Sequence, residues 1–136
     1  MKVRTWLLVA AGLAAGSVAA CADPVVPLGP GNQMTVTNQP GLFRFQAKDL
    51  NNVIADTSFT WVTADSQARI LHHSLITHGE MELHVVDANG VEVYSHEVSV
   101  VYETDTLTNR GAPGSWTVRF DIKAATGKVD VTLETP

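Results

Sequence analysis

The chain has 136 residues, 45% hydrophobic and 17% charged, which suits one globular domain and is too short for two ordinary ones. Its 9 Lys and Arg stand against 14 Asp and Glu, a formal net charge of −5. Nucleic-acid-binding domains usually carry a basic excess, so no nucleic-acid partner is expected. The single Cys excludes a disulfide within the chain.

Residues 1–20 have the order of a secretory signal peptide. Lys2 and Arg4 give a short positive start, residues 6–15 are apolar or Gly, and small residues follow. A membrane-spanning helix needs about 20 predominantly apolar residues, and this Ala/Gly-rich stretch is shorter. The sequence therefore predicts a signal peptide over residues 1–20.

The next residues resemble a lipid-attachment motif. Val18-Ala19-Ala20-Cys21 is similar to the lipobox of bacterial lipoproteins, with Val where Leu is commoner. In that family the Cys receives a diacylglyceryl thioether and becomes the mature N-terminus. The resemblance implies a lipid anchor on Cys21 and a place in the bacterial cell envelope, facing the periplasm or exterior. The same resemblance, to enterobacterial lipoproteins, implies that Ala22 favours the outer membrane if the source is Gram-negative. The alternative is an ordinary cleaved signal and a Cys present by chance.

Residues 21–33 are interpreted as the lipidated Cys and a Pro/Gly tether. Twelve semi-extended residues at about 3.1 Å each would reach on the order of 35 Å. Cleavage after residue 20 removes Lys2 and Arg4, which leaves seven basic against 14 acidic residues and a net charge of −7. Anionic headgroups should repel such a domain, so a spacer would be useful. The alternative is a first edge strand through residues 24–26.

Residues 34–136 are expected to form one all-β domain, a single antiparallel β-sandwich of about 7–8 strands. Polar and apolar residues alternate with period two. No window of eleven or more residues has a convincing helical period. The expected strands are 42–47, 58–63, 68–75, 80–85, 91–102, 115–122 and 128–133. Turns are expected at 87–90 and 123–127, and a loop at 109–114.

The last two expected strands resemble the final hairpin of bacterial secreted jelly-roll-like modules. The segments are Gly114–Phe120 and Gly127–Leu133, supported by the earlier turn at 87–90. The resemblance implies a β-sandwich accessory domain and carries no catalytic residue. The apolar residues expected to face the core are Phe43, Phe45, Phe59, Trp61, Ile70, Met81, Leu83, Val85, Val93, Trp116, Val118, Phe120, Ile122, Val129, Val131 and Leu133.

Histidine and glutamate gather in the middle of the chain. All five His lie within 25 positions, and clustered imidazoles and carboxylates can bind Zn or Cu. A regular hairpin around 87–90 places His84 opposite Tyr94 and Glu82 opposite His96, so these four form a candidate ligand face. The alternatives are ordinary cross-strand pairs, which need no ligand, and a pH-sensitive surface. A third strong ligand is not assured, so neither metal nor cofactor is assigned.

No local motif marks an enzyme, because GxSxG, GxGxxG, HExxH and the P-loop are all absent. Trp61 and Trp116 are read as core residues rather than a sugar-stacking platform, and Tyr94 and Tyr102 are better candidates for an exposed contact. The sequence is interpreted as a non-enzymatic, lipid-anchored envelope lipoprotein, an accessory module for a protein partner. The alternatives are a metal- or glycan-binding module using the outer His/Glu/Tyr face, and a small hydrolase.

Overall fold

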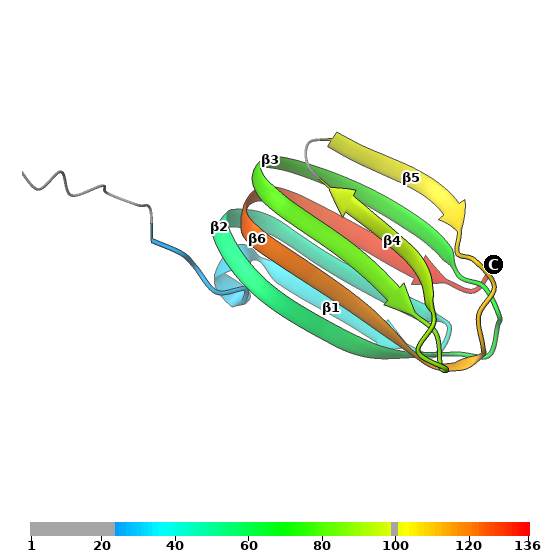
Figure 1. Cartoon of the computed structure of the whole chain (residues 1–136). Helices are drawn as coiled ribbons and strands as arrows, with labels where there is room; N and C mark the ends of the chain where they lie inside the picture. Colours follow the sequence, from blue (N-terminus) through cyan, green and yellow to red (C-terminus); the bar gives the residue numbers. More distant parts are fainter. Residues whose placement is uncertain (1–23, 99–100) are drawn as a thin grey trace, which may run out of the picture.

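The computed structural model of the chain describes residues 24–98 and 101–136, which form an all-β fold (Figure 1). The expected signal peptide and Cys21 lie outside these residues. Within them, no helix is long and apolar enough to cross a membrane. The elements are a 3-10 helix η1 (Pro30–Asn32) and strands β1 (Met34–Gln39), β2 (Leu42–Thr63), β3 (Arg69–Val86), β4 (Glu92–Val98), β5 (Val101–Leu107) and β6 (Gly114–Glu134). The all-β prediction is confirmed.

Three strands are far longer than the sequence pattern predicted. Each of β2, β3 and β6 joins two of the expected short strands into one. Residues 123–127, expected as a hairpin turn, lie inside β6, so the predicted last hairpin is wrong. Register shifts in the middle of these strands break the period-two alternation. Ala124 and Gly127 have positive φ there, as turn residues often do, but here they bend a continuous strand.

Each long strand folds back near its middle, so one antiparallel sheet makes two facing layers. The first layer contains β1, the first halves of β2 and β3, the second half of β6, and β5. The second layer contains the other halves and β4. The rings of Phe43 and Phe59, from opposite halves of β2, have centroids 5.5 Å apart, and Phe45 stacks on Phe120 at 4.3 Å. The fold is therefore sandwich-like, with one shared core.

The core agrees closely with the alternation of the sequence. Every expected core residue is buried except Phe59, which packs against the core half-buried. Trp61 and Trp116 are fully buried and meet edge to face, with ring centroids 5.9 Å apart. Their indole N–H groups donate to Gln39 O and Ala112 O, at 3.1 and 2.7 Å. Buried apolar residues that the pattern missed are Ala47, Leu50, Val53, Ala68, Ile76, Val98 and Ala125.

The bends of β3 and β6 pack against each other so closely that two positions require glycine. A Cβ on Gly79 would overlap the carbonyl oxygen of Ala124, and a Cβ on Gly127 would overlap that of Leu75. Both glycines also have positive φ, 70° and 142°. We call this end of the domain, formed by residues 48–54, 77–80 and 123–128, the bend end.

The opposite end of the domain, which we call the loop end, contains the 87–90 turn, the 108–113 loop and the C-terminus. The described N-terminal residues approach the bend end in Figure 1, whereas the C-terminus lies at the loop end. The two ends of the chain therefore lie at opposite ends of the domain.

The segment expected as a free tether is held to the bend end from Pro24 onward. Asn52 Nδ2 donates to Pro24 O at 3.2 Å, and Val26 N donates to Asn52 O at 3.1 Å. Farther along, the buried Asn32 donates from Nδ2 to Asp49 O at 3.0 Å. This part of the expected spacer therefore does not run free, and the edge-strand alternative reduces to an isolated bridge at Val26.

Gly127→Ala should lower the free energy of unfolding by about 3 kcal/mol or more, because the new Cβ meets a backbone carbonyl at a positive φ. The matched control is Gly31→Ala, whose Cβ would meet nothing within 4 Å and should cost less than about 0.5 kcal/mol. Urea denaturation measures both variants. Equal unfolding midpoints would contradict the packing described for the bend.

Candidate functional site

The expected hairpin register is wrong by one residue beyond its turn. In the structure Val85 pairs with Tyr94 and Leu83 with His96, because Val93 is an extra residue, a bulge, between successive pairs. Tyr94 and His96 therefore share the inner side with the buried Val85 and Leu83.

The turn itself forms as predicted, and the carboxylate of Asp87 holds it in place. Gly90 N donates to Asp87 O at 3.1 Å, with Gly90 at a φ of 80°. Asp87 Oδ1 accepts the N–H of Val91 at 2.8 Å, and Oδ2 accepts that of Ala112 at 2.7 Å. These backbone donors, with Ala112 the largest contributor, hold the pKa of Asp87 below its usual value. One side chain thus joins the turn to the 108–113 loop.

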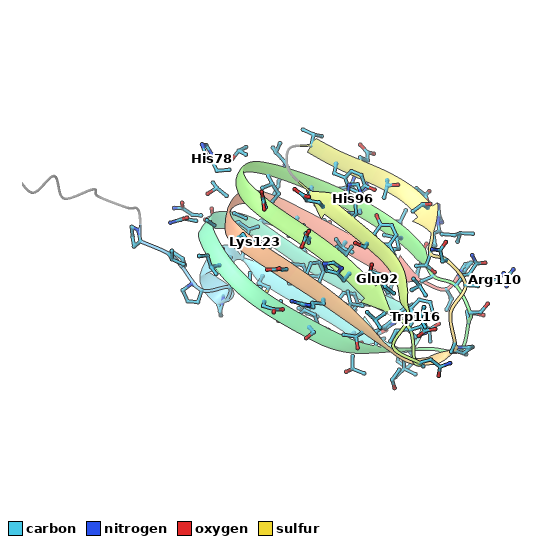
Figure 2. The ribbon with its side chains drawn as sticks, viewed as in Figure 1. His78, Glu92, His96, Arg110, Trp116 and Lys123 are labelled. Carbon is cyan, nitrogen blue, oxygen red and sulfur yellow. The ribbon has the colours of Figure 1, made fainter. Side chains whose placement is uncertain are left out.

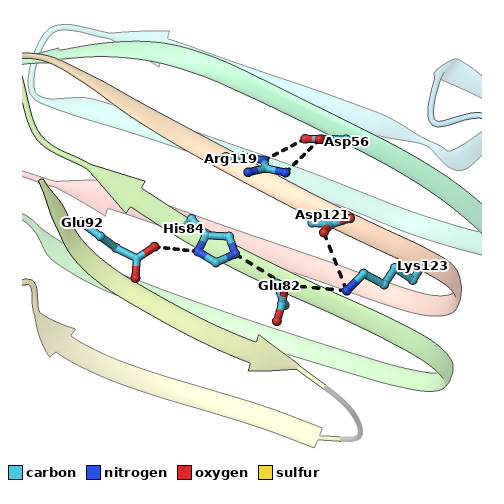
Figure 3. Close-up of polar contacts among 7 residues, drawn as sticks. All are labelled: Asp56, Glu82, His84, Glu92, Arg119, Asp121 and Lys123. Atoms are coloured by element: carbon cyan, nitrogen blue, oxygen red, sulfur yellow. Dashed lines mark hydrogen bonds and ion pairs between the residues drawn. The ribbon is translucent and has the colours of Figure 1, made fainter. Parts of the chain in front are cut away.

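Glu82 and His84 lie on the outer face of the second layer, in a row of ion pairs (Figure 3). His84 Nδ1 lies 2.8 Å from Glu92 Oε2, and His84 Nε2 lies 3.6 Å from Glu82 Oε2. Lys123 Nζ is 3.8 Å from both Glu82 and Asp121. The two imidazole nitrogens face different carboxylates, so the three groups do not converge on one ion.

The same face carries a paired arginine on β6. Both guanidinium nitrogens of Arg119 that contact Asp56 lie 2.9 Å from its carboxylate oxygens. The hydrogen bond to Arg119 holds the pKa of Asp56 below its usual value. These contacts link β2, β3, β4 and β6 across the outer surface.

The candidate ligand face is therefore split between two surfaces. Glu82 and His84 point outward, whereas Tyr94 and His96 lie on the inner side. Over residues 24–98 and 101–136, no group of three His, Cys, Asp or Glu side chains is arranged to hold a metal ion. The sequence placed all four residues together only because it assumed a regular hairpin.

Tyr94 and His96 belong instead to a polar and aromatic cluster where β4 and β5 meet. His96 stacks on Tyr102 with ring centroids 3.6 Å apart, and the hydroxyls of Tyr94 and Tyr102 are 3.2 Å apart. His72, fully buried on β3, meets Tyr102 edge to face at 4.9 Å. Its Nε2 lies 2.6 Å from Ser74 Oγ. The tyrosines expected to be exposed contacts are half-buried against the core.

The buried imidazole of His72 is held neutral. Burial lowers its pKa to about 4, and its Nδ1 has no hydrogen-bond partner in the described part of the chain. A catalytic Ser–His pair needs a third group that orients the imidazole. Because Nδ1 meets no such group and Ser74 is itself buried, the pair acts as a core contact in this geometry.

Sequence reasoning missed a groove of about 610 Å³ on the outer face of the first layer. Four strands that are distant in sequence contribute to it, so no local motif could reveal it. Its polar lining includes Gln46, Lys48, His73, Glu103, Lys128 and Asp130.

No protein-family model matches the chain, and a search of curated proteins finds no match. The fold defines a β-sandwich-like module. Its function has to be inferred from the residues of this chain.

Replacing His72 with Phe, together with Ser74→Ala to avoid an orphaned hydroxyl, should remove part of the acid sensitivity of the fold. The folded pKa of about 4 lies below the ordinary 6.5, so the unfolded chain binds more protons between these values. Wild-type stability from this group is complete above 6.5 and falls as the pH drops toward 4.

Urea unfolding at about pH 7 and about pH 4.5 measures this loss in the wild type and the double variant. The exposed His78→Gln is the control and should keep the wild-type loss. An equal loss of stability in the double variant and the wild type would contradict the role of His72.

Proposed function

We propose that this chain is a lipid-anchored envelope lipoprotein whose β-domain acts as a non-enzymatic binding or accessory module for a protein partner. The observation that carries the proposal is the position of Cys21. It is the sole Cys, it follows a positive start, an apolar run and Val18-Ala19-Ala20, and it precedes the folded domain directly. Only two residues separate it from Pro24, where contacts with the domain begin.

The anchor needs no help from the protein surface. Each buried CH₂ contributes about 0.8 kcal/mol, and stable attachment takes two lipid chains or one chain with a basic patch. A diacylglyceryl thioether on Cys21 supplies two chains. A protein with a net charge of −7 after residue 20 can then stay on an anionic membrane despite repulsion.

The loop end is the surface best placed for a protein partner. The exposed apolar side chains Val62, Val91 and Leu107 lie at this end, with relative exposures of 50%, 56% and 50%. The anchor leaves from the opposite end, so these side chains face away from the membrane.

The competing functions lack a comparable observation. The metal- or glycan-binding alternative needed Glu82, His84, Tyr94 and His96 on one face, and the structure separates them. The hydrolase alternative needed an oriented nucleophile, and the Ser74 hydroxyl is buried beside an imidazole with an unpartnered Nδ1. The lipoprotein proposal depends on neither group.

Cys21→Ser should release the protein from the membrane fraction of the producing cells without unfolding it. The reason is that the lipid attaches at residue 21, whereas every buried core residue lies at Phe43 or beyond. Fractionation with a high-salt wash measures release, and circular dichroism of the released protein checks its folding. A matched Ala22→Ser variant should stay with the membrane. Retention of Cys21→Ser after the wash would contradict the proposal.

A further inference from the structure

The three lysines that follow residue 20 all lie at the bend end. Lys123 Nζ has two carboxylate neighbours, Glu82 and Asp121, each at 3.8 Å. Lys48 and Lys128 differ, because neither has a carboxylate within 4 Å among the residues that the structure describes. Although the chain is acidic, two of its cationic side chains at the bend end have no carboxylate partner among the described residues.

Lys48 and Lys128 also lie close to each other across the sheet. Ala47 and Val129 are the last regular pair of β2 and β6 before the bend. Lys48 follows Ala47 and Lys128 precedes Val129, so both lysines lie next to this pair on the side toward the bend. Like charges at neighbouring cross-strand positions repel each other, which destabilises a sheet unless an anion lies between them. The pair therefore marks a place suited to a negative group.

The groove described above contains both lysines, and one of its two acids, Asp130, is paired with an arginine. Asp130 accepts hydrogen bonds from Arg44 at 3.0 and 2.6 Å, and Glu103 lies 3.6 Å from His73. With Asp130 paired to Arg44, the two lysines outnumber the one remaining carboxylate of the groove, Glu103. Apolar lining comes from Ala47, Leu75, Val101 and Val129. Unpaired cations beside apolar surface fit an amphiphile with an anionic head.

A lipid anchor on Cys21 would bring membrane phospholipids close to this groove. Pro24 is held at the bend end, and three extended residues reach at most about 11 Å, so a lipid on Cys21 lies close to this end. Residues 54–63 of β2 span about 30 Å, which places the loop end out of reach. Val25, Ile54 and Val101 are exposed at or beside the bend end.

We propose that this groove binds the phosphate headgroup of an anionic phospholipid in the membrane that anchors the protein, with Lys48 and Lys128 as its cationic contacts. The inference rests on the proposed lipidation of Cys21 for its biological setting. The rest of the acidic surface is repelled by the same headgroups, so this contact sets one orientation, with the bend end on the bilayer and the loop end away from it.

A chemically tethered protein tests the groove without relying on cellular lipidation. Residues 21–136, which contain every core residue, are coupled through the sole thiol, Cys21, to maleimide lipids in vesicles. The lysines are then acetylated with a water-soluble reagent, and mass spectrometry gives the rate at each one. The vesicles contain either phosphatidylglycerol or only phosphatidylcholine, and Lys123 is the internal control.

We expect Lys48 and Lys128 to react about fivefold more slowly on phosphatidylglycerol than on phosphatidylcholine, and Lys123 to be unchanged. About 1 M NaCl should remove the protection. Phosphatidylglycerol should also raise the Tm of the wild type and of Lys123→Gln, but not of the folded double variant Lys48→Gln/Lys128→Gln.

Three results would overturn the proposal. Equal rates on both lipids would show that no headgroup binds, and equal protection of all three lysines would show general contact instead of a groove. Protection by inorganic phosphate on phosphatidylcholine vesicles would make free phosphate the ligand. Because the coupling is chemical, none of these results bears on lipidation in cells, which the Cys21→Ser fractionation tests separately.

Discussion

The close approach of three bent strands at one end of the domain determines the rest of this structure. Gly79 of β3 lies against a backbone carbonyl of β6, and Gly127 of β6 lies against a backbone carbonyl of β3. A side chain at either position would not fit. Because β2, β3 and β6 all fold back at this level, a single sheet supplies both layers and encloses one core. The same bends give the molecule two unlike ends, one receiving the N-terminal segment and one carrying the loops.

The polar groups of the domain follow from this geometry. On the outer faces arginines and acids pair, as Arg119 does with Asp56 and Arg44 with Asp130. Strands β4 and β5 pair with different halves of β3, and their side chains meet around Tyr102. The buried imidazole of His72 packs against Tyr102 and is therefore part of the core. Lys48 and Lys128, which have no carboxylate partner among the described residues, lie at the bend end, whereas Arg110 lies at the loop end (Figure 2).

Much of the fold could be predicted because alternation reports which side of a strand is buried. Trp116, Val118 and Phe120 are buried at every second position, and the Asp87–Gly90 turn forms as its residues indicate. The fold-back could not be predicted from the sequence. A residue that favours positive φ, followed by a new alternating segment, occurs both in a hairpin and in a bent strand. The two readings differ only in tertiary contacts, such as that of Phe43 with Phe59.

The candidate site was harder to predict than the fold. One bulge residue, Val93, moves Tyr94 and His96 to the inner side and dissolves the expected ligand face. The groove could not be found from local sequence, because Lys48 and Lys128 come together only through the pairing of β2 with β6. Register and long-range pairing, rather than composition, therefore decide which side chains can act together.

The most direct test of this two-ended arrangement is photo-crosslinking in cells, with the photoreactive amino acid at Ile54 or at Val91. Both side chains are exposed, at 51% and 56%, and they lie at the bend end and the loop end. The account predicts lipid adducts from position 54 and a discrete protein adduct from position 91. Lipid adducts from position 91, or no protein adduct from it, would contradict the account.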